Sequence, residues 1–187
     1  MVRMDKFMKQ NNTTLKTALV FSFFNFHSSF ATAQECNSAV PATTPNSAFT
    51  VHNDGTVTHN TTGLMWKVCS EGQTWNAGDS SCSGSASTHT WQQALQIPQT
   101  LNVGGGYAGH SDWRLPNLKE LKSIVELQCS YPAINAAVFS NIPAFYWSSS
   151  PSAYGGNHAW GVDFASGYGR YDYRNYYNYV RLVRNGQ

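Results

Sequence analysis

The sequence carries little charge, and beyond its N-terminal segment it has no long apolar run. Asp, Glu, Lys and Arg make up 12% of its 187 residues. After position 33, eight basic residues stand against nine acidic residues, which leaves a net charge of −1. At that charge a general nucleic-acid-binding role loses its electrostatic support. Because no second apolar segment reaches the roughly 20 residues that cross a bilayer, we expect no transmembrane span there.

The sequence also lacks the common local motifs of catalysis and cofactor binding. We find no G-x-S-x-G elbow, P-loop, dinucleotide fingerprint or H-E-x-x-H pair. His110, Ser111 and Asp112 are consecutive, but neighbours in an extended segment point their side chains in different directions. A catalytic triad needs these groups to converge in space. We therefore interpret the tripeptide as structural and expect no enzyme activity, no cofactor and no metal.

The N-terminal segment has the three regions of a signal peptide. Lys6, Lys9 and Lys16 supply positive charge, residues 18–30 are mostly apolar, and Ala31-Thr32-Ala33 fits an A-x-A cleavage site. This order predicts a signal peptide over residues 1–33 with cleavage after Ala33. The product would then be exported to the periplasm, to the cell surface or out of the cell.

The exported part contains all four cysteines, Cys36, Cys69, Cys82 and Cys129. An even number in an exported domain favours two disulfides, for which three connectivities exist. Cys69 and Cys82 bracket a polar, glycine-containing segment, so closing that loop locally is the economical choice. The remaining bridge would join Cys36 to Cys129. A metal site is disfavoured because CxxC spacing and a nearby histidine pair are absent.

The mature chain reads as one domain of mixed structure. Residues 34–48 are a Pro/Ser/Thr-rich lead-in that we expect to lie extended on the surface, and residues 49–187 form the domain. Asn53-Asp54-Gly55, between alternating apolar residues, predicts a β-hairpin turn. A calcium loop at the same place would need a ladder of further acidic residues. Residues 64–66 form an apolar run that predicts a core strand.

Two helices follow the hairpin. Thr90 can cap a first helix whose apolar residues recur at i, i+3 and i+4, and Pro98 is expected to bend or end it. Asn117 with Glu120 three residues later forms a capping-box pattern for a second helix. The apolar stripe of that helix runs over residues 118–125.

Five segments together resemble the Lcl C-terminal domain family of exported bacterial proteins: TGLMW at 62–66, CSEGQTW at 69–75, SDWRLPNLKEL at 111–121, FYWSSS at 145–150 and YVRLVR at 179–184. This family includes the tip of a collagen-like adhesin that binds sulfated glycosaminoglycans. The resemblance implies an α+β, C-type-lectin-like fold with two helices packed on antiparallel strands. Collagen repeats and the E-P-N and W-N-D signatures of calcium-dependent lectins are absent, so calcium-mediated sugar binding is not expected.

The C-terminal third holds an unusual run of tyrosines interleaved with arginines. Tyr offers a flat apolar face with a polar tip, and Arg offers a planar bidentate donor for sulfate or carboxylate. The run would therefore suit an anionic glycan. Tyr is also a good strand residue, so packing within a sheet is a second interpretation, and alternate residues could serve both uses. The predicted ligand-binding residues are Arg170, Arg174, Tyr168, Tyr171, Tyr173 and Tyr176.

Three functional hypotheses follow from these observations. The first is an exported, non-enzymatic binding module for anionic glycans or extracellular matrix. The second is an interaction or structural domain of the cell envelope, because Tyr and Arg are also enriched at protein interfaces. The third is an enzyme, which would predict a cleft with an acid or base of perturbed pKa among His89, His110, Asp112, His158 and Asp163.

Overall fold

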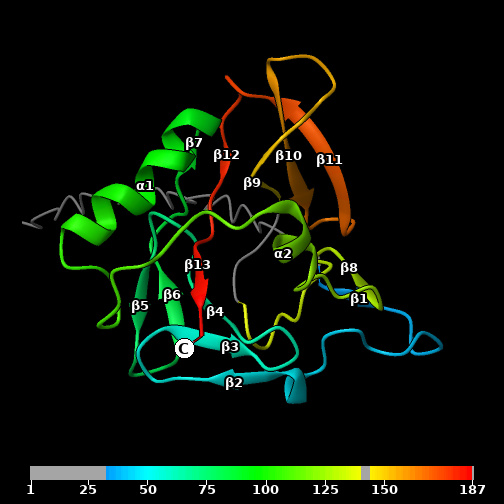
Figure 1. Ribbon diagram of the computed structural model, residues 1–187. Helices are drawn as coiled ribbons and strands as arrows, with labels where there is room; N and C mark the ends of the chain where they lie inside the picture. Colours follow the sequence, from blue (N-terminus) through cyan, green and yellow to red (C-terminus); the bar gives the residue numbers. More distant parts are fainter. Residues whose placement is uncertain (1–32, 140–143, 187) are drawn as a thin grey trace, which may run out of the picture. The chain divides into compact units, whose positions relative to one another are not determined.

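The computed structural model describes residues 33–139 and 144–186 (Figure 1). The predicted signal peptide lies outside these residues except for Ala33. In chain order the elements are β1 (Glu35–Cys36), η1 (Asn46–Ala48), β2 (Phe49–Val51), β3 (Thr56–His59), β4 (Leu64–Lys67), β5 (Thr74–Asn76), β6 (Ser81–Ser83), β7 (Thr88–His89), α1 (Trp91–Val103), α2 (Leu118–Lys122), β8 (Cys129–Ser130), β9 (Phe145–Pro151), β10 (His158–Asp163), β11 (Tyr168–Tyr173), β12 (Asn178–Tyr179) and β13 (Val183–Asn185).

The strands form two larger sheets and two small two-stranded sheets. One sheet has the order β11-β10-β9-β12-β7, and the other has the order β13-β4-β3-β2. The pairs are β1-β8 and β5-β6. The predicted α+β class fits this arrangement, but the expectation of antiparallel strands fails at one place. Strand β12 pairs with β9 in parallel, with Tyr179 beside Tyr146, because the chain reaches β12 only after crossing over from the opposite edge of the sheet.

The predicted hairpin turn joins β2 to β3. Gly55 has φ +82°, a left-handed conformation that glycine adopts without a steric penalty. The Asp54 carboxylate accepts hydrogen bonds from the backbone N–H and the hydroxyl of Thr56, so it serves the turn itself. The predicted core strand over residues 64–66 is confirmed as β4.

Of the two outcomes expected at Pro98, a bend or an end, the helix does not end there: α1 begins at the Thr90 capping box and continues to Val103 with Pro98 inside it. Proline removes one helical hydrogen bond. The side chain of Asn102 anchors the last turn to a distant segment. Its amide donates to the Trp113 carbonyl at 2.8 Å and accepts from the Trp113 N–H at 3.1 Å.

Helix α2 is shorter than its apolar stripe predicted. The expected capping box of Asn117 and Glu120 is present. The Glu120 carboxylate also accepts hydrogen bonds from Nη1 and Nη2 of Arg114 at 2.7 and 2.8 Å. The Ser123 N–H and hydroxyl both donate to the Glu120 carbonyl, which closes the helix after Lys122. Among the described residues, neither helix is long and apolar enough to span a membrane.

Strand β9 divides the hydrophobic core into two clusters. Successive side chains of a strand point to opposite faces of its sheet. Phe145 and Trp147 accordingly belong to the cluster that contains Ala94 of α1, whereas Tyr146 belongs to the cluster that contains Leu121 of α2. The five-stranded sheet therefore has a helix on each face. Strand β10 also contributes to both clusters, through Val162 and Ala159, and β11 is the outer strand beside it.

The C-terminal segment is buried to an extent that its arginines do not suggest. Val180, Leu182 and Val183 are buried, and Arg181 among them is also 0% exposed. Its Nη1 donates to the carbonyl oxygens of Lys67 and Val68, and its guanidinium lies 4.9 Å from the centre of the Phe139 ring. Arg181 thus satisfies backbone carbonyls inside the core.

Two disulfides join Cys36 to Cys129 and Cys69 to Cys82, the pairing expected from the sequence. The first bridge ties down the lead-in at residues 34–48, which is more structured than a plain extended segment. Its strand β1 pairs with β8, and Thr44 is buried. The carboxylate of Glu126 accepts the N–H groups of Thr43 and Thr44 at 2.8 Å each. The lead-in is therefore held covalently and by a buried carboxylate.

Candidate functional site

Most of the tyrosines of the C-terminal run face solvent. Tyr168, Tyr171 and Tyr173 belong to β11, which is an outer strand, and Tyr176 lies in the turn before β12. Tyr168 is the most exposed of them, at 74%. Tyr179 by contrast packs against the core. The exposed rings are therefore available for a ligand.

Tyr171 and Tyr173 gather with aromatic side chains of the neighbouring strand and loop. Tyr173 lies 4.3 Å from the ring of His158, its cross-strand partner, and 5.3 Å from Tyr176. Tyr171 stacks on Tyr154 with ring centres 5.0 Å apart. We call Tyr154, Tyr171, Tyr173 and Tyr176 the tyrosine patch. Its rings make cross-strand contacts and still face solvent. They therefore pack within the sheet and are also available to a ligand.

Arg174 is held rigidly beside the tyrosine patch. Its backbone N–H donates to the carbonyl of Asn157, and its carbonyl accepts the N–H of Trp91. The side-chain Nε donates to the carbonyl of His158 at 3.0 Å, and the guanidinium lies 4.4 Å from the centre of the Trp91 ring. Within the described residues, Nη1 and Nη2 have no hydrogen-bond partner, so a planar pair of donors remains available to a ligand.

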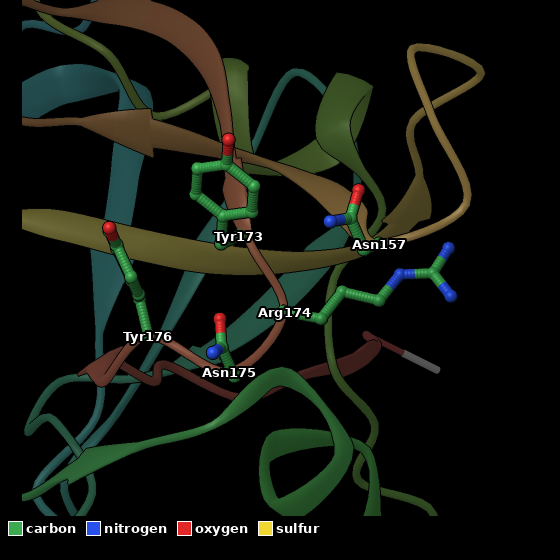
Figure 2. Close-up of a pocket in the computed structure, with 5 residues that line it drawn as sticks. All are labelled: Asn157, Tyr173, Arg174, Asn175 and Tyr176. Carbon is green, nitrogen blue, oxygen red and sulfur yellow. The ribbon is translucent and has the colours of Figure 1, made fainter.

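Arg174 separates two shallow hollows on this surface. One, of about 500 Å³, is lined by Asn157, Tyr173, Arg174, Asn175 and Tyr176 (Figure 2). The other, of about 430 Å³, is lined by Thr90, Trp91, Gln92, Leu95, Arg174 and Asn175. In Figure 2 the guanidinium of Arg174 points away from the rings of Tyr173 and Tyr176. Arg174 and the two tyrosines therefore do not close on each other. We call the surface formed by Arg174, Tyr173 and Tyr176 the ridge.

Two of the six predicted ligand-binding residues lie apart from this ridge. Arg170 is on the face of β11 opposite to Tyr171, because neighbouring strand residues alternate. Its guanidinium lies 4.6 Å from the centre of the Phe145 ring and 3.5 Å from the carboxylate of Asp163. Tyr168 pairs with Asp163 at the far end of the strand. The structure therefore brings together Arg174 and three of the four predicted tyrosines.

Sequence reasoning missed several residues of the site. Tyr154 and Asn157 lie in the connection PSAYGGN between β9 and β10, and Trp91 begins α1. An aromatic and an amide residue beside Gly155 and Gly156 are a usable signal, because antiparallel pairing places this connection at the end of β11. Trp91 gave no comparable signal, since its spacing is that of an ordinary buried helix face.

Two of the side chains considered for the enzyme hypothesis, Asp112 and His89, have hydrogen-bond partners within the domain. Asp112 accepts Arg184 Nε at 2.6 Å, and this hydrogen bond holds the pKa of the carboxyl below its ordinary value. His89 Nε2 lies 2.8 Å from the Ser87 hydroxyl. In the part of the chain that the structure describes, no group of three His, Cys, Asp or Glu side chains could hold a metal ion.

An α+β domain with two disulfides and an exposed aromatic–arginine surface is the class of protein that fold and site define. The family model described as the Lcl C-terminal domain matches residues 55–184, and the chain belongs to that family. The resemblance drawn from the sequence motifs is thereby confirmed. No curated protein matches the chain. Family and disulfides together favour a binding module associated with adhesins and are consistent with export.

Proposed function

We propose that this domain is a non-catalytic binding module, exported to the periplasm, the cell surface or the medium, that recognises an anionic, sulfated glycan at Arg174 and at Tyr173 and Tyr176 of the tyrosine patch. The observation that carries the proposal is the guanidinium of Arg174, fixed on the Trp91 ring with its two Nη atoms unpaired within the described residues. A preorganised guanidinium binds a sulfate or carboxylate through two parallel hydrogen bonds. It loses little side-chain entropy on binding, because it is already held in place.

The surroundings of Arg174 match the rest of such a ligand. The exposed ring faces of Tyr173 and Tyr176 can cover the apolar face of a sugar ring, while their hydroxyls stay in water. The side-chain amides of Asn157 and Asn175 line the same hollow and can bond sugar hydroxyls. Because a hollow lies on each side of Arg174, a linear chain could place its anionic group on the ridge and a sugar in each hollow.

The test is binding of short sulfated, carboxylated and neutral oligosaccharides to the purified chain, measured by calorimetry at low and high salt. Arg174→Gln is expected to weaken binding of the sulfated ligand by about tenfold or more, which corresponds to about 1.4 kcal/mol or more. Arg170→Gln is the matched control, because it removes the same charge from the same region but outside the ridge. Equal losses in both variants, or no saturable binding at all, would contradict the proposal.

A protein partner in the cell envelope is the second candidate for the same surface. Exposed Tyr together with Arg is the residue pattern that protein interfaces favour. This function predicts that glycans fail to bind while an envelope protein is captured by the wild-type chain and not by Tyr173→Ala. The two candidates are therefore separated by the class of ligand that the Tyr173 and Arg174 variants lose.

A further inference from the structure

Strand β11 is an unprotected edge of the five-stranded sheet. It pairs with β10 on one side and is the outermost strand in the order β11-β10-β9-β12-β7 (Figure 1). All six of its residues, Tyr168–Tyr173, pair with β10 in continuous register, without a bulge. Exposed edges are usually blunted by charged side chains, proline or bulges. Strand β11 has no proline and no bulge, and its two charged residues, Arg170 and Asp172, are of opposite sign, so they do not repel a second copy of the same strand. Its outer backbone groups are therefore a template for another strand.

The hydrogen bonds around β10 show which residues of β11 direct their backbone outward. The N–H of Arg174 donates to the carbonyl of Asn157, just before β10, so the pairs Ala159–Asp172 and Gly161–Arg170 are bonded and the pair Trp160–Tyr171 between them is not. In an antiparallel ladder such non-bonded pairs alternate with bonded ones. The N–H of Tyr173, two residues on, meets the side chain of Asp172 instead of β10. The outward backbone groups of β11 are therefore those of Gly169, Tyr171 and Tyr173.

We propose that β11 pairs antiparallel with β11 of a second copy of this chain, about a twofold axis at Tyr171. In that register the outward groups of Tyr171 bond across the axis, and those of Gly169 lie opposite Tyr173. In the single chain Asp172 accepts the Tyr173 N–H and the side-chain amide of Asn178, so pairing requires Asp172 to exchange the Tyr173 N–H for Arg170 of the second copy, which frees that N–H for the new ladder. Arg170 then lies opposite Asp172 of the second copy, and the symmetric pair forms on the other side of the axis. These are the non-bonded positions of the new ladder, where side chains approach most closely.

The charges of Arg170 and Asp172 favour a twofold axis at Tyr171 over an axis at a neighbouring position of β11. A twofold axis at Arg170 would oppose two guanidinium groups, and an axis at Asp172 would oppose two carboxylates. An axis between residues 170 and 171 would pair no charges at all. Arg170 is able to change partner, since its side chain is 53% exposed and lies 3.5 Å from the carboxylate of Asp163.

The tyrosines of β11 also favour a second copy of this chain as the partner of this edge strand. Tyr171 would lie at the axis, and Tyr154 already covers its ring. Both tyrosines are exposed in the single chain, so pairing two copies would remove four rings from water. A strand from an unrelated protein could use the backbone groups, but it would lack the reciprocal Arg170 and Asp172 charges.

The test is sedimentation equilibrium of the purified chain with both disulfides formed, over a range of protein concentrations. The wild-type chain is expected to be a reversible dimer. Arg170→Asp and Asp172→Arg each place like charges across the axis, and each is expected to raise the dimer dissociation constant by about tenfold or more. Asp79→Arg, a charge reversal in the loop between β5 and β6, is the control that leaves dimerisation unchanged.

Mixing the two variants makes the test specific to this register. Arg170→Asp and Asp172→Arg should form a heterodimer at wild-type affinity, because each supplies the charge that the other lacks. The double swap in one chain should restore the homodimer. A wild-type chain that stays monomeric at about 200 μM, or variants that dimerise alone as well as the wild type does, would overturn the proposal.

Discussion

Glu126 is predicted to be a main stabilising contact of the lead-in, and replacing it by glutamine tests this directly. Its carboxylate is buried and accepts three backbone N–H groups, from Thr43 at 2.8 Å, Thr44 at 2.8 Å and Gln128 at 2.9 Å. The hydroxyl of Thr44 adds a fourth hydrogen bond at 3.0 Å. Glutamine has nearly the same shape, but it presents a donor where one carboxylate oxygen stood. At least one buried N–H then loses its acceptor.

The magnitude follows from these contacts. A hydrogen bond to a charged group contributes about 1.5 to 3 kcal/mol, and an orphaned buried donor costs about 1 to 3 kcal/mol. Glu126→Gln keeps an acceptor at one oxygen and loses it at the other, so we expect the free energy of unfolding to fall by about 2 to 4 kcal/mol. Urea denaturation followed by tryptophan fluorescence, with both disulfides intact, measures this difference. Glu35→Gln is the matched control, since Glu35 is exposed in the same lead-in.

The pH dependence gives a second readout of the same contact. Burial by itself raises the pKa of Glu126, but hydrogen bonds from Thr43, Gln128 and Thr44 outweigh it, and the pKa lies below its ordinary value. A lowered folded-state pKa means that the stabilisation is complete above the unfolded pKa of about 4.3 and is lost as pH falls through the folded value. The gap between wild type and Glu126→Gln should therefore close in acid. A loss under about 1 kcal/mol at pH 7, or a gap that is the same at pH 3, would refute this reasoning.

Two further predictions concern the core and the covalent links. Gly161→Ala should lower the free energy of unfolding by about 3 kcal/mol, because the Cβ added on β10 would overlap the Tyr146 carbonyl oxygen of the neighbouring strand β9; wild-type stability in urea would contradict this. Removing the Cys36–Cys129 bridge, which spans 93 residues, should cost about 4.7 kcal/mol, against about 3 kcal/mol for Cys69–Cys82, which spans 13. Paired serine variants in thermal denaturation give the order, and the reverse order would show that loop entropy does not dominate.

The elements that the sequence predicted well are those set by neighbouring residues. The turn at Gly55 and the capping boxes at Thr90 and Asn117 depend on contacts within three or four positions. The last turn of α1, beyond Pro98, is bound through Asn102 to the distant backbone of Trp113, which no local pattern contains. Local signals therefore placed the starts of both helices, whereas the extent of α1 accompanies a tertiary contact and the end of α2 a local one, at Ser123.

The sequence predicted which kinds of residue form the candidate site, but not which individual residues belong to it. The run of tyrosines and arginines marked β11 and its turn, but strand alternation sends Arg170 to the face opposite Tyr171. Tyr154 joins the patch through a loop whose position depends on the pairing of β9 with β10. Arg181 shows the converse, since a charged residue among apolar neighbours gave no sign that it would bond buried carbonyls.

The separation of Arg170 from Arg174 decides how the two proposals can be tested independently. Each copy of the dimer would present one Arg174 ridge, so a long polymer could bind two ridges at once and gain affinity through avidity. A short oligosaccharide binds one ridge and reports on Arg174 alone. Arg170→Gln should then weaken binding of the polymer and leave the oligosaccharide unaffected, whereas Arg174→Gln should weaken both. If Arg170→Gln reduces oligosaccharide binding as much as Arg174→Gln does, the binding surface lies on the opposite face of β11 and the ridge is not the site.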